Sequence, residues 1–221
     1  MQKKDELLAN SLLFSGLPAE QLREIAQISV SKRYPKGASI FFEGDPGIGF
    51  YMVASGKVKI FKMSFDGKEQ ILHIFGPGEP FGEVPVFHGS PFPANAETLS
   101  ESELLFFPRA EFVNLVTANP SLALNMLAVL ALRLRRFATQ IENLSLKEVP
   151  GRLASYLCYL MDEQQREDKV VLDIPKGQLA SLLGTSSETL SRIFNKMTEE
   201  RMIRVEGKTI SILDVQGLKE R

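Results

Sequence analysis

The chain has little cysteine, no tryptophan and no strong excess of charge of either sign. Its 221 residues include one cysteine, Cys158, which excludes a disulfide within the chain and a cysteine-based metal cluster. The formal net charge is −1, so the chain as a whole exerts no strong attraction on nucleic acids or acidic membranes. Any nucleic-acid interface must therefore be a local surface. A lone thiol suits a reducing compartment, and we expect a cytoplasmic protein.

Long hydrophobic runs are also missing. The longest apolar stretch, 122–134, is interrupted by Asn125 and Arg133 and is shorter than the roughly 20 residues that a membrane-spanning helix needs. The first residues mix charged with apolar side chains and lack the apolar centre of a signal peptide. With 44% hydrophobic and 24% charged residues, the composition is typical of a soluble protein without a membrane partner.

Short β-type segments fill the first half of the chain after a helix that we expect to begin near Pro18. Segments such as FYMVA, VKIFKM and EQILHIF recur between glycine, proline and aspartate residues. Strands of about 4–8 residues at spacings of about 8–12 are typical of an antiparallel sandwich or barrel. Gly56 and Gly67 mark tight turns, because glycine adopts the positive φ that such turns need. The segment 104–107 is the last expected strand.

One long helix is predicted for 119–147, because its apolar residues recur at alternating steps of four and three. Pro120 suits the first turn of such a helix. The apolar stripe fits two interpretations, an amphipathic helix that packs on its own domain or a parallel seam between two copies. The narrowness of the stripe favours the seam. Its predicted residues are Leu127, Leu130, Leu134, Phe137, Ile141 and Leu144.

The last third of the chain begins with a helix breaker, the proline and glycine at 150–151, which we expect to end the long helix and to form a hinge. The sequence then predicts a helix over 152–161, a short strand, two helices around Gly184 and a hairpin that turns at Gly207. This order is typical of a winged helix-turn-helix. The predicted fold class is α+β, with domains at 1–118, 119–147 and 148–221.

Polar side chains gather on one side of the second helix around Gly184, expected over 185–200, while Leu190, Ile193, Phe194 and Met197 form its apolar face. In a helix-turn-helix, the N-terminal half of the second helix enters the major groove of DNA. There arginine can bridge O6 and N7 of guanine, and glutamate can accept from an exocyclic amino group. The predicted DNA-binding residues are Thr185, Ser186, Ser187, Glu188, Ser191, Arg192, Asn195 and Lys196.

A purely structural interpretation of this helix is also open. Thr185 and Glu188 fit a capping box, with Thr185 as N-cap and Glu188 at the third position. Glu188 and Arg192 also form an i,i+4 pair, which contributes about 0.2–0.5 kcal/mol. Over 185–208 there are five basic residues against four acidic ones. This small excess does not decide between the two interpretations.

Two long segments resemble the Crp/Fnr family of bacterial transcription regulators. Residues 39–83 resemble its cyclic-nucleotide-binding-type β-roll, and 174–214 resemble its winged helix-turn-helix. The resemblance implies an N-terminal, jelly-roll-like antiparallel β-roll, a long central dimerisation helix and a C-terminal DNA-binding domain. It implies a transcription regulator, not an enzyme, that binds a palindromic operator as a homodimer. An effector in the roll would bias the DNA modules through the long helix and the hinge.

The resemblance also implies partners. Glu188, Ser191 and Arg192 match the Fnr-type motif Glu-x-x-Ser-Arg, so we expect TTGA-containing half-sites with Arg192 on the guanine. RNA polymerase is a further candidate partner of such a regulator.

The effector is a separate question. In cyclic-nucleotide binders of this family a Gly-Glu pair precedes an arginine that holds the phosphate and a hydroxyl residue. Gly82 and Glu83 match the first pair, but Pro93 and Ala94 take the other two places. A buried phosphate without its cation is costly, so cyclic AMP is not expected. The predicted effector pocket comprises Gly82, Glu83, Pro93, Ala94, Asn95 and Leu127.

The residues that other cofactors of the family need can be compared with this sequence in the same way. The iron–sulfur sensors of the family need several cysteines, and this chain has one. Haem needs an axial ligand, for which His73, in the apolar run ILHIF, and His88, in an expected loop, are the candidate imidazoles. The Pro-Ala-x-Ala-Glu stretch and the recognition helix resemble the nitric-oxide and nitrosative-stress branch of the family. Haem, nitric oxide and a small organic ligand therefore stay open, and no metal site is assigned.

A different class of protein is the alternative hypothesis. The roll also resembles cupin-type folds, so the chain could be a cupin-like ligand-binding or metal enzyme domain fused to a helical module. Such enzymes gather several histidines and carboxylates on neighbouring strands. An enzyme would turn over a substrate without DNA, whereas a regulator would bind a palindromic duplex in a salt-dependent way.

Overall fold

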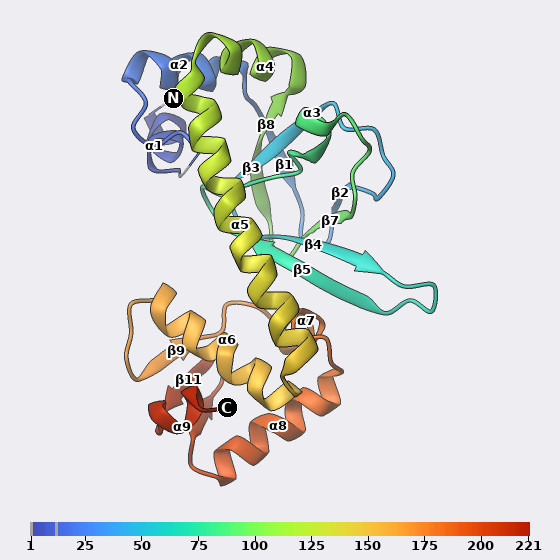
Figure 1. Cartoon of the computed structure of the whole chain (residues 1–221), viewed down its shortest axis with the longest axis vertical. Coiled ribbons are helices and arrows are strands. Elements are labelled where there is room, and N and C mark those ends of the chain that lie inside the picture. Colours follow the sequence, from blue (N-terminus) through green and yellow to red (C-terminus); the bar gives the residue numbers. More distant parts are fainter. Residues whose placement is uncertain (1, 12) are drawn as a thin grey trace. The chain divides into compact units, whose positions relative to one another are not determined.

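The computed structural model describes residues 2–11 and 13–221, which form two compact units (Figure 1). One unit ends at Arg135, and the other covers Arg136–Arg221. The three domains at 1–118, 119–147 and 148–221 remain a prediction. Met1 and Leu12, which the first of these domains includes, lie outside the described residues.

Two four-stranded sheets form the centre of the first unit, and paired strands are antiparallel throughout. One sheet has the order β1 (Val30–Tyr34), β8 (Ser102–Pro108), β3 (Gly49–Ser55) and β6 (Pro80–Phe81). The other has the order β2 (Ser39–Phe41), β7 (Asn95–Thr98), β4 (Val58–Met63) and β5 (Glu69–Phe75). This arrangement confirms the predicted antiparallel roll. Gly56 and Gly67 adopt φ values of 86° and 79°, as the tight turns require.

Both faces of β3 are covered. Its residues 50–53 are all buried, which explains the unbroken apolar run FYMV. Phe50 belongs to a core shared with the helices and stacks on Phe107, with the ring centroids 4.8 Å apart. Tyr51 faces the other way, into the core between the sheets, and stacks on Phe81 at 5.4 Å. The roll is therefore packed on both sides of its first sheet.

The described residues of the first unit form four shorter helices, and three of these were not predicted. The helix near Pro18 is present as α2 (Ala19–Ile28), whereas α1 (Gln2–Asn10), α3 (Val84–His88) and α4 (Arg109–Ala118) are additional. Their stability comes from tertiary packing, since Leu8 and Phe112 are fully buried in one core cluster with Phe50. His88 was expected in a loop, and this was wrong, because it is the last residue of α3.

The long helix is present as α5 (Pro120–Leu146), with Pro120 in its first turn as expected. One face buries Leu122, Met126 and Val129. No single helix among the described residues has both the length and the apolar composition for a membrane span. The bent pair of α4 and α5, which meet at 112°, satisfies those two criteria only in combination.

The second unit contains a helix-turn-helix followed by a hairpin. Its elements are the end of α5, α6 (Val149–Glu163), β9 (Lys169–Val171), α7 (Lys176–Leu182), α8 (Ser187–Glu199), β10 (Ile203–Glu206), β11 (Thr209–Ile212) and α9 (Val215–Lys219). The strands pair antiparallel in the order β10, β11, β9, and Gly207 turns the hairpin with a φ of 62°. The predicted winged helix-turn-helix is confirmed.

The proline and glycine at 150–151 were expected to end the long helix, but they lie inside the helix that follows it. The predicted helix over 152–161 begins three residues earlier, at Val149, so Pro150 and Gly151 lie in its first turn. Proline is tolerated there because the first backbone amides of a helix have no partner within it. The break between α5 and α6 is thus the two-residue link Lys147–Glu148.

Candidate nucleic-acid interface

The start of α8 is fixed by Ser186. Its Oγ accepts a hydrogen bond from the amide of Thr189 at 3.2 Å, which makes Ser186 the N-cap of a helix that begins at Ser187. The prediction that Thr185 is the N-cap of this helix was wrong. The amide of Thr185 instead bonds the carbonyl oxygen of Ala180 at 3.0 Å, so Thr185 still belongs to the turn that follows α7.

One face of α8 is buried in the second unit. Leu190, Ile193, Phe194 and Met197 are at most 9% exposed. The turn before α8 uses Gly184, whose φ of 64° favours a residue without a Cβ atom. Lys176, at the start of α7, places its ammonium group 5.0 Å from the ring centroid of Phe194. Burial of the apolar face therefore determines which side of α8 remains outside.

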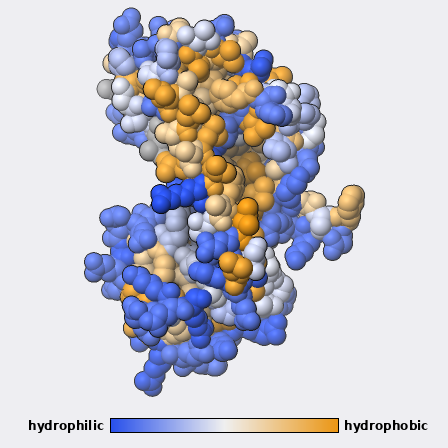
Figure 2. Space-filling model, in the orientation of Figure 1, coloured by the Kyte–Doolittle hydropathy of each residue, from blue (hydrophilic) through white to orange (hydrophobic). Residues whose placement is uncertain are grey.

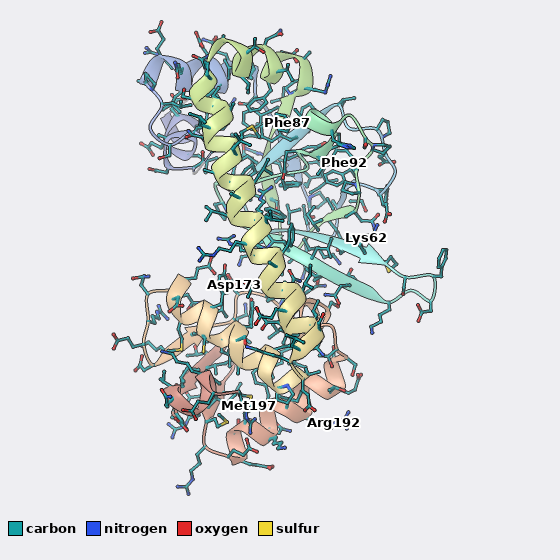
Figure 3. The ribbon with its side chains drawn as sticks, in the orientation of Figure 1. Lys62, Phe87, Phe92, Asp173, Arg192 and Met197 are labelled. Carbon is teal, nitrogen blue, oxygen red and sulfur yellow. The ribbon has the colours of Figure 1, made fainter. Side chains whose placement is uncertain are left out.

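The predicted DNA-binding residues lie on that outer side. Thr185 is half-buried, and the other seven are exposed: Ser186, Ser187, Glu188, Ser191, Arg192, Asn195 and Lys196. Figure 3 shows Arg192 projecting outward from α8, whereas Met197 lies on its inner side. The structure therefore brings the eight residues together on one surface.

Local bonds orient the two charged residues at the start of this surface. Arg192 donates from Nη2 to Thr189 Oγ1 at 3.1 Å, whereas the purely structural interpretation of the sequence paired it with Glu188. Hydrogen bonds from its own backbone amide and from the Ser186 hydroxyl lower the pKa of Glu188, and the charge of Arg192 adds a smaller effect. Glu188 is therefore an acceptor at neutral pH.

Lys176 and Lys208 are further cations of the second unit that were not among the predicted DNA-binding residues. Lys176 of α7 and Lys208, at the turn of the hairpin, are both exposed. Lys196 is largely exposed and lies 4.0 Å from Glu200. The signal available for Lys176 was its position at the start of the first helix of the predicted helix-turn-helix.

The predicted seam residues lie along one outer face of α5. Leu127 (62%), Leu130 (37%), Leu134 (71%), Phe137 (42%) and Ile141 (63%) are exposed, and we call them the exposed stripe. Leu144 is half-buried. Figure 2 shows apolar side chains at the surface along this helix. Leucine and phenylalanine side chains in such a row are typical of a contact with another apolar surface.

The predicted effector residues Gly82 and Glu83 lie between β6 and α3. The carboxylate of Glu83 is nearly buried and pairs with the guanidinium of Arg133, which comes from α5. Arg133 also donates to the carbonyl oxygen of Pro80, and its guanidinium lies 5.0 Å from the ring centroid of Phe75. Glu83 thus already has a cationic partner within the chain.

Of the other predicted effector residues, Leu127 lies on α5, where its side chain is exposed, and the remaining three lie in and before β7. Pro93 is exposed, and its carbonyl oxygen accepts from Lys62 Nζ at 2.9 Å, while Lys62 also pairs with Glu43. Ala94 is buried, and Asn95 Oδ1 accepts from the amide of Glu43 at 3.0 Å. Phe92, which precedes Pro93 in the sequence, stacks on Phe41 with 3.7 Å between ring centroids. Figure 3 labels Lys62 on β4 and Phe92 in the segment before β7.

The two histidines belong to different elements. His73 on β5 lies edge-on to Phe75, and its Nε2 is 3.8 Å from Glu79 Oε1. His88 at the end of α3 is exposed, with Nδ1 2.6 Å from Ser90 Oγ. Among residues 2–11 and 13–221, no three His, Cys, Asp or Glu side chains are grouped so that they could hold a metal ion.

Comparisons with known proteins agree with this architecture. The family model of the cyclic nucleotide-binding domain matches residues 31–119, and that of the Crp-like helix-turn-helix domain matches 151–221. The CRP-like cAMP-activated global transcriptional regulator of Mycobacterium tuberculosis is 32% identical over 98% of this chain and 99% of its own. The cyclic AMP receptor protein of Thermus thermophilus is 34% identical over 96% of this chain and 97% of its own.

A solved structure shows the same fold. FixK2 from Bradyrhizobium japonicum superposes with a TM-score of 0.77 at 22% identity, over 87% of this chain and 96% of that protein. The comparisons give no support to a cupin-like metal enzyme. Sequence identity, domain order and fold agree with the resemblance noted at the start, and the chain belongs to the Crp/Fnr family of DNA-binding transcription regulators.

Proposed function

We propose that two copies of this chain, joined along the exposed stripe of α5, bind a palindromic operator in the cytoplasm with α8 of each copy in a major groove. The observation that supports this most directly is the division of α8 into a buried apolar face and an exposed polar one. A two-fold dimer places its two recognition helices about one helical turn of DNA apart. The operator is therefore an inverted repeat.

The base contacts follow from donor and acceptor chemistry. Arg192 has a fork of N–H donors that fits O6 and N7 of guanine, and Glu188 is an ionised acceptor for the amino group of cytosine or adenine. Ser191 lies on the same exposed side and reaches either a base or a phosphate. With the family's motif, these residues favour a TTGA-containing half-site with Arg192 on the guanine.

The phosphate contacts are made by exposed lysine side chains of the second unit. Lys196, Lys176 and Lys208 are exposed at the end of α8, at the start of α7 and at the tip of the hairpin. Phosphate contacts position a protein on the duplex without reading its sequence. With a net charge of −1 for the whole chain, these few cations carry the electrostatic part of binding, and RNA polymerase is the expected partner of the DNA-bound dimer.

The proposed effector of the roll is not cyclic AMP, although two relatives are named for that nucleotide. Pro93 provides no cation, the nearby Lys62 is already paired with Glu43, and Glu83 is held by Arg133. A cyclic phosphate would thus lose its water without gaining a free partner. Haem, nitric oxide or a small organic ligand is the proposed class, in the region of Gly82, Glu83 and Pro93 to Asn95.

The operator is tested with the full-length protein and a duplex that carries two inverted TTGA half-sites. Fluorescence anisotropy should show preference over a scrambled duplex and a fall in affinity with salt. Arg192→Ala should remove about 1–3 kcal/mol of discrimination at the guanine position. Arg166→Ala is the control, because Arg166 is exposed in the turn after α6. An unchanged base preference in Arg192→Ala would refute the assigned base contact.

The effector class is tested by an absorption spectrum of freshly purified protein, taken without oxygen and with added haem and nitric oxide. A Soret band that is lost in His73→Ala or His88→Ala supports haem. Cyclic AMP is tested separately by its effect on duplex binding, for which we expect no change. A cyclic-AMP-dependent gain in affinity would contradict the proposed effector class.

A further inference from the structure

One guanidinium bonds two carbonyl oxygens that belong to different parts of the second unit. Arg152, in the first turn of α6, donates from Nε to the carbonyl oxygen of Lys147 at 3.1 Å. It also donates from Nη1 to the carbonyl oxygen of Leu183 at 2.6 Å. Lys147 lies in the link after α5, and Leu183 is the C-cap of α7. Arg152 therefore connects the end of α5 with the helix-turn-helix.

The link is attached to α6 at several points. Lys147 Nζ donates to Ser155 Oγ at 2.7 Å, one turn further along α6. The amide of Arg152 donates to the carbonyl oxygen of Glu148 at 3.0 Å. The amide of Lys147 donates to the carbonyl oxygen of Asn143 at 3.1 Å, so Lys147 is bonded to the last turn of α5 as well as to α6. The link consequently transmits the direction of α5 to α6.

The other end of the connection lies just before the recognition helix. The amide of Leu183 bonds the carbonyl oxygen of Leu179 at 2.9 Å, and the amide of Thr185 bonds that of Ala180 at 3.0 Å. Ser186 then caps α8. Because only Gly184 and Thr185 separate Leu183 from the cap, the bond from Arg152 holds the point from which α8 starts.

We propose that Arg152 is a positioning residue that sets the spacing between the two recognition helices of the dimer, and thereby the half-site spacing of the operator. This inference rests on the proposed dimer. Phe137, Ile141 and Leu144 of the predicted seam lie in the second unit with Arg152 and α8. The path from seam to recognition helix thus runs within one compact unit. The two carbonyls need a forked donor, which lysine does not offer.

The test uses duplexes in which the distance between two inverted TTGA half-sites differs by one and two base pairs. Wild-type protein should prefer one spacing over its neighbours by about tenfold or more, since half-site spacing follows dimer geometry. In Arg152→Lys this preference should fall to about twofold, while the preference for TTGA over an altered half-site stays unchanged, because Arg192 still reads the guanine. Arg166→Lys is the matched control on an exposed arginine.

A second variant distinguishes a loss of positioning from a loss of folding. Ser155→Ala removes only the bond to Lys147 Nζ and should reduce the spacing preference partly, to about threefold, with an unchanged melting temperature. A wild-type spacing preference in both variants would overturn the inference. Equal weakening on all duplexes, in step with a lower melting temperature, would also overturn it. A wild-type protein that ignores inverted repeats would overturn the operator and this inference together, and that result appears before any substitution.

Discussion

Arg133 of α5 and Glu83 at the start of α3 form an ion pair across 50 positions of sequence. Their side chains are 16% and 11% exposed, and Arg133 also holds the carbonyl oxygen of Pro80. Removal of one partner from such a pair leaves a charge that has lost both water and counter-ion. The pair therefore joins the long helix to the part of the roll where an effector is expected.

Arg133→Met should lower the free energy of unfolding by about 3 kcal/mol, because the Glu83 carboxylate loses its cation while it stays largely buried. Chemical denaturation at fixed protein concentration measures this. Adding Glu83→Gln should restore part of the loss. Arg23→Met on the exposed side of α2 is the control, and an equal effect of both single substitutions would contradict a buried pair.

Leu134→Asp should weaken self-association by at least about tenfold, because an unpaired carboxylate would enter the seam. In one copy the side chain is 71% exposed, so the fold of that copy should be unaffected. Sedimentation against concentration measures the change. Leu132→Asp is the matched control, since Leu132 is 47% exposed but lies roughly 160° round the helix from Leu134. A Leu134→Asp protein that remains dimeric would remove the seam assignment.

Ser186→Ala should destabilise the second unit by about 1 kcal/mol, because the amide of Thr189 loses its acceptor. Thr185→Ala, one residue earlier, should change the free energy of unfolding by less than about 0.5 kcal/mol. Denaturation curves of the two variants decide which residue caps α8. A larger effect at Thr185 would contradict the observed cap.

The Glu188 carboxyl should titrate below its ordinary value of 4.5, because its own amide and the Ser186 hydroxyl bond the ionised form. Since the folded-state pKa is the lower one, the stabilisation is present above 4.5 and disappears as the pH falls through the folded-state pKa. A carbon-detected NMR titration gives the midpoint. Ser186→Ala should raise it, and a midpoint that stays the same would contradict the bond from Ser186.

The strands and the order of the C-terminal helices were predictable because their signals are local. Glycines at positive φ, such as Gly56 and Gly207, mark the turns, and apolar spacing marks α5 and α8. Helices α1 and α4 were missed because each depends on one or two side chains, such as Leu8 and Phe112, that are buried in a core built by distant segments. Their own sequences carry only a weak periodic signal.

Only part of the candidate sites could be predicted, because some local patterns fit two residues equally well and some contacts join distant parts of the sequence. A serine and a threonine stand side by side before α8, and a capping pattern starts equally well at either. The amide of Thr185 is bonded within the turn after α7, and the next residue, Ser186, is the N-cap of α8. The contacts of Arg133 and Arg152 join residues 50 and 31 positions apart, which no local pattern reveals.

The two apolar faces of α5 restrict how this helix can change in length during evolution. Leu122, Met126 and Val129 pack on the first unit, while the exposed stripe turns outward and continues to Ile141. Insertion of one residue after Val129 would rotate everything that follows by about 100° and put the two sets out of phase. An insertion of seven residues rotates it by only about 20°. Homologues with a longer helix at this place should therefore differ by lengths close to a whole number of helical turns, such as about seven, eleven or eighteen residues.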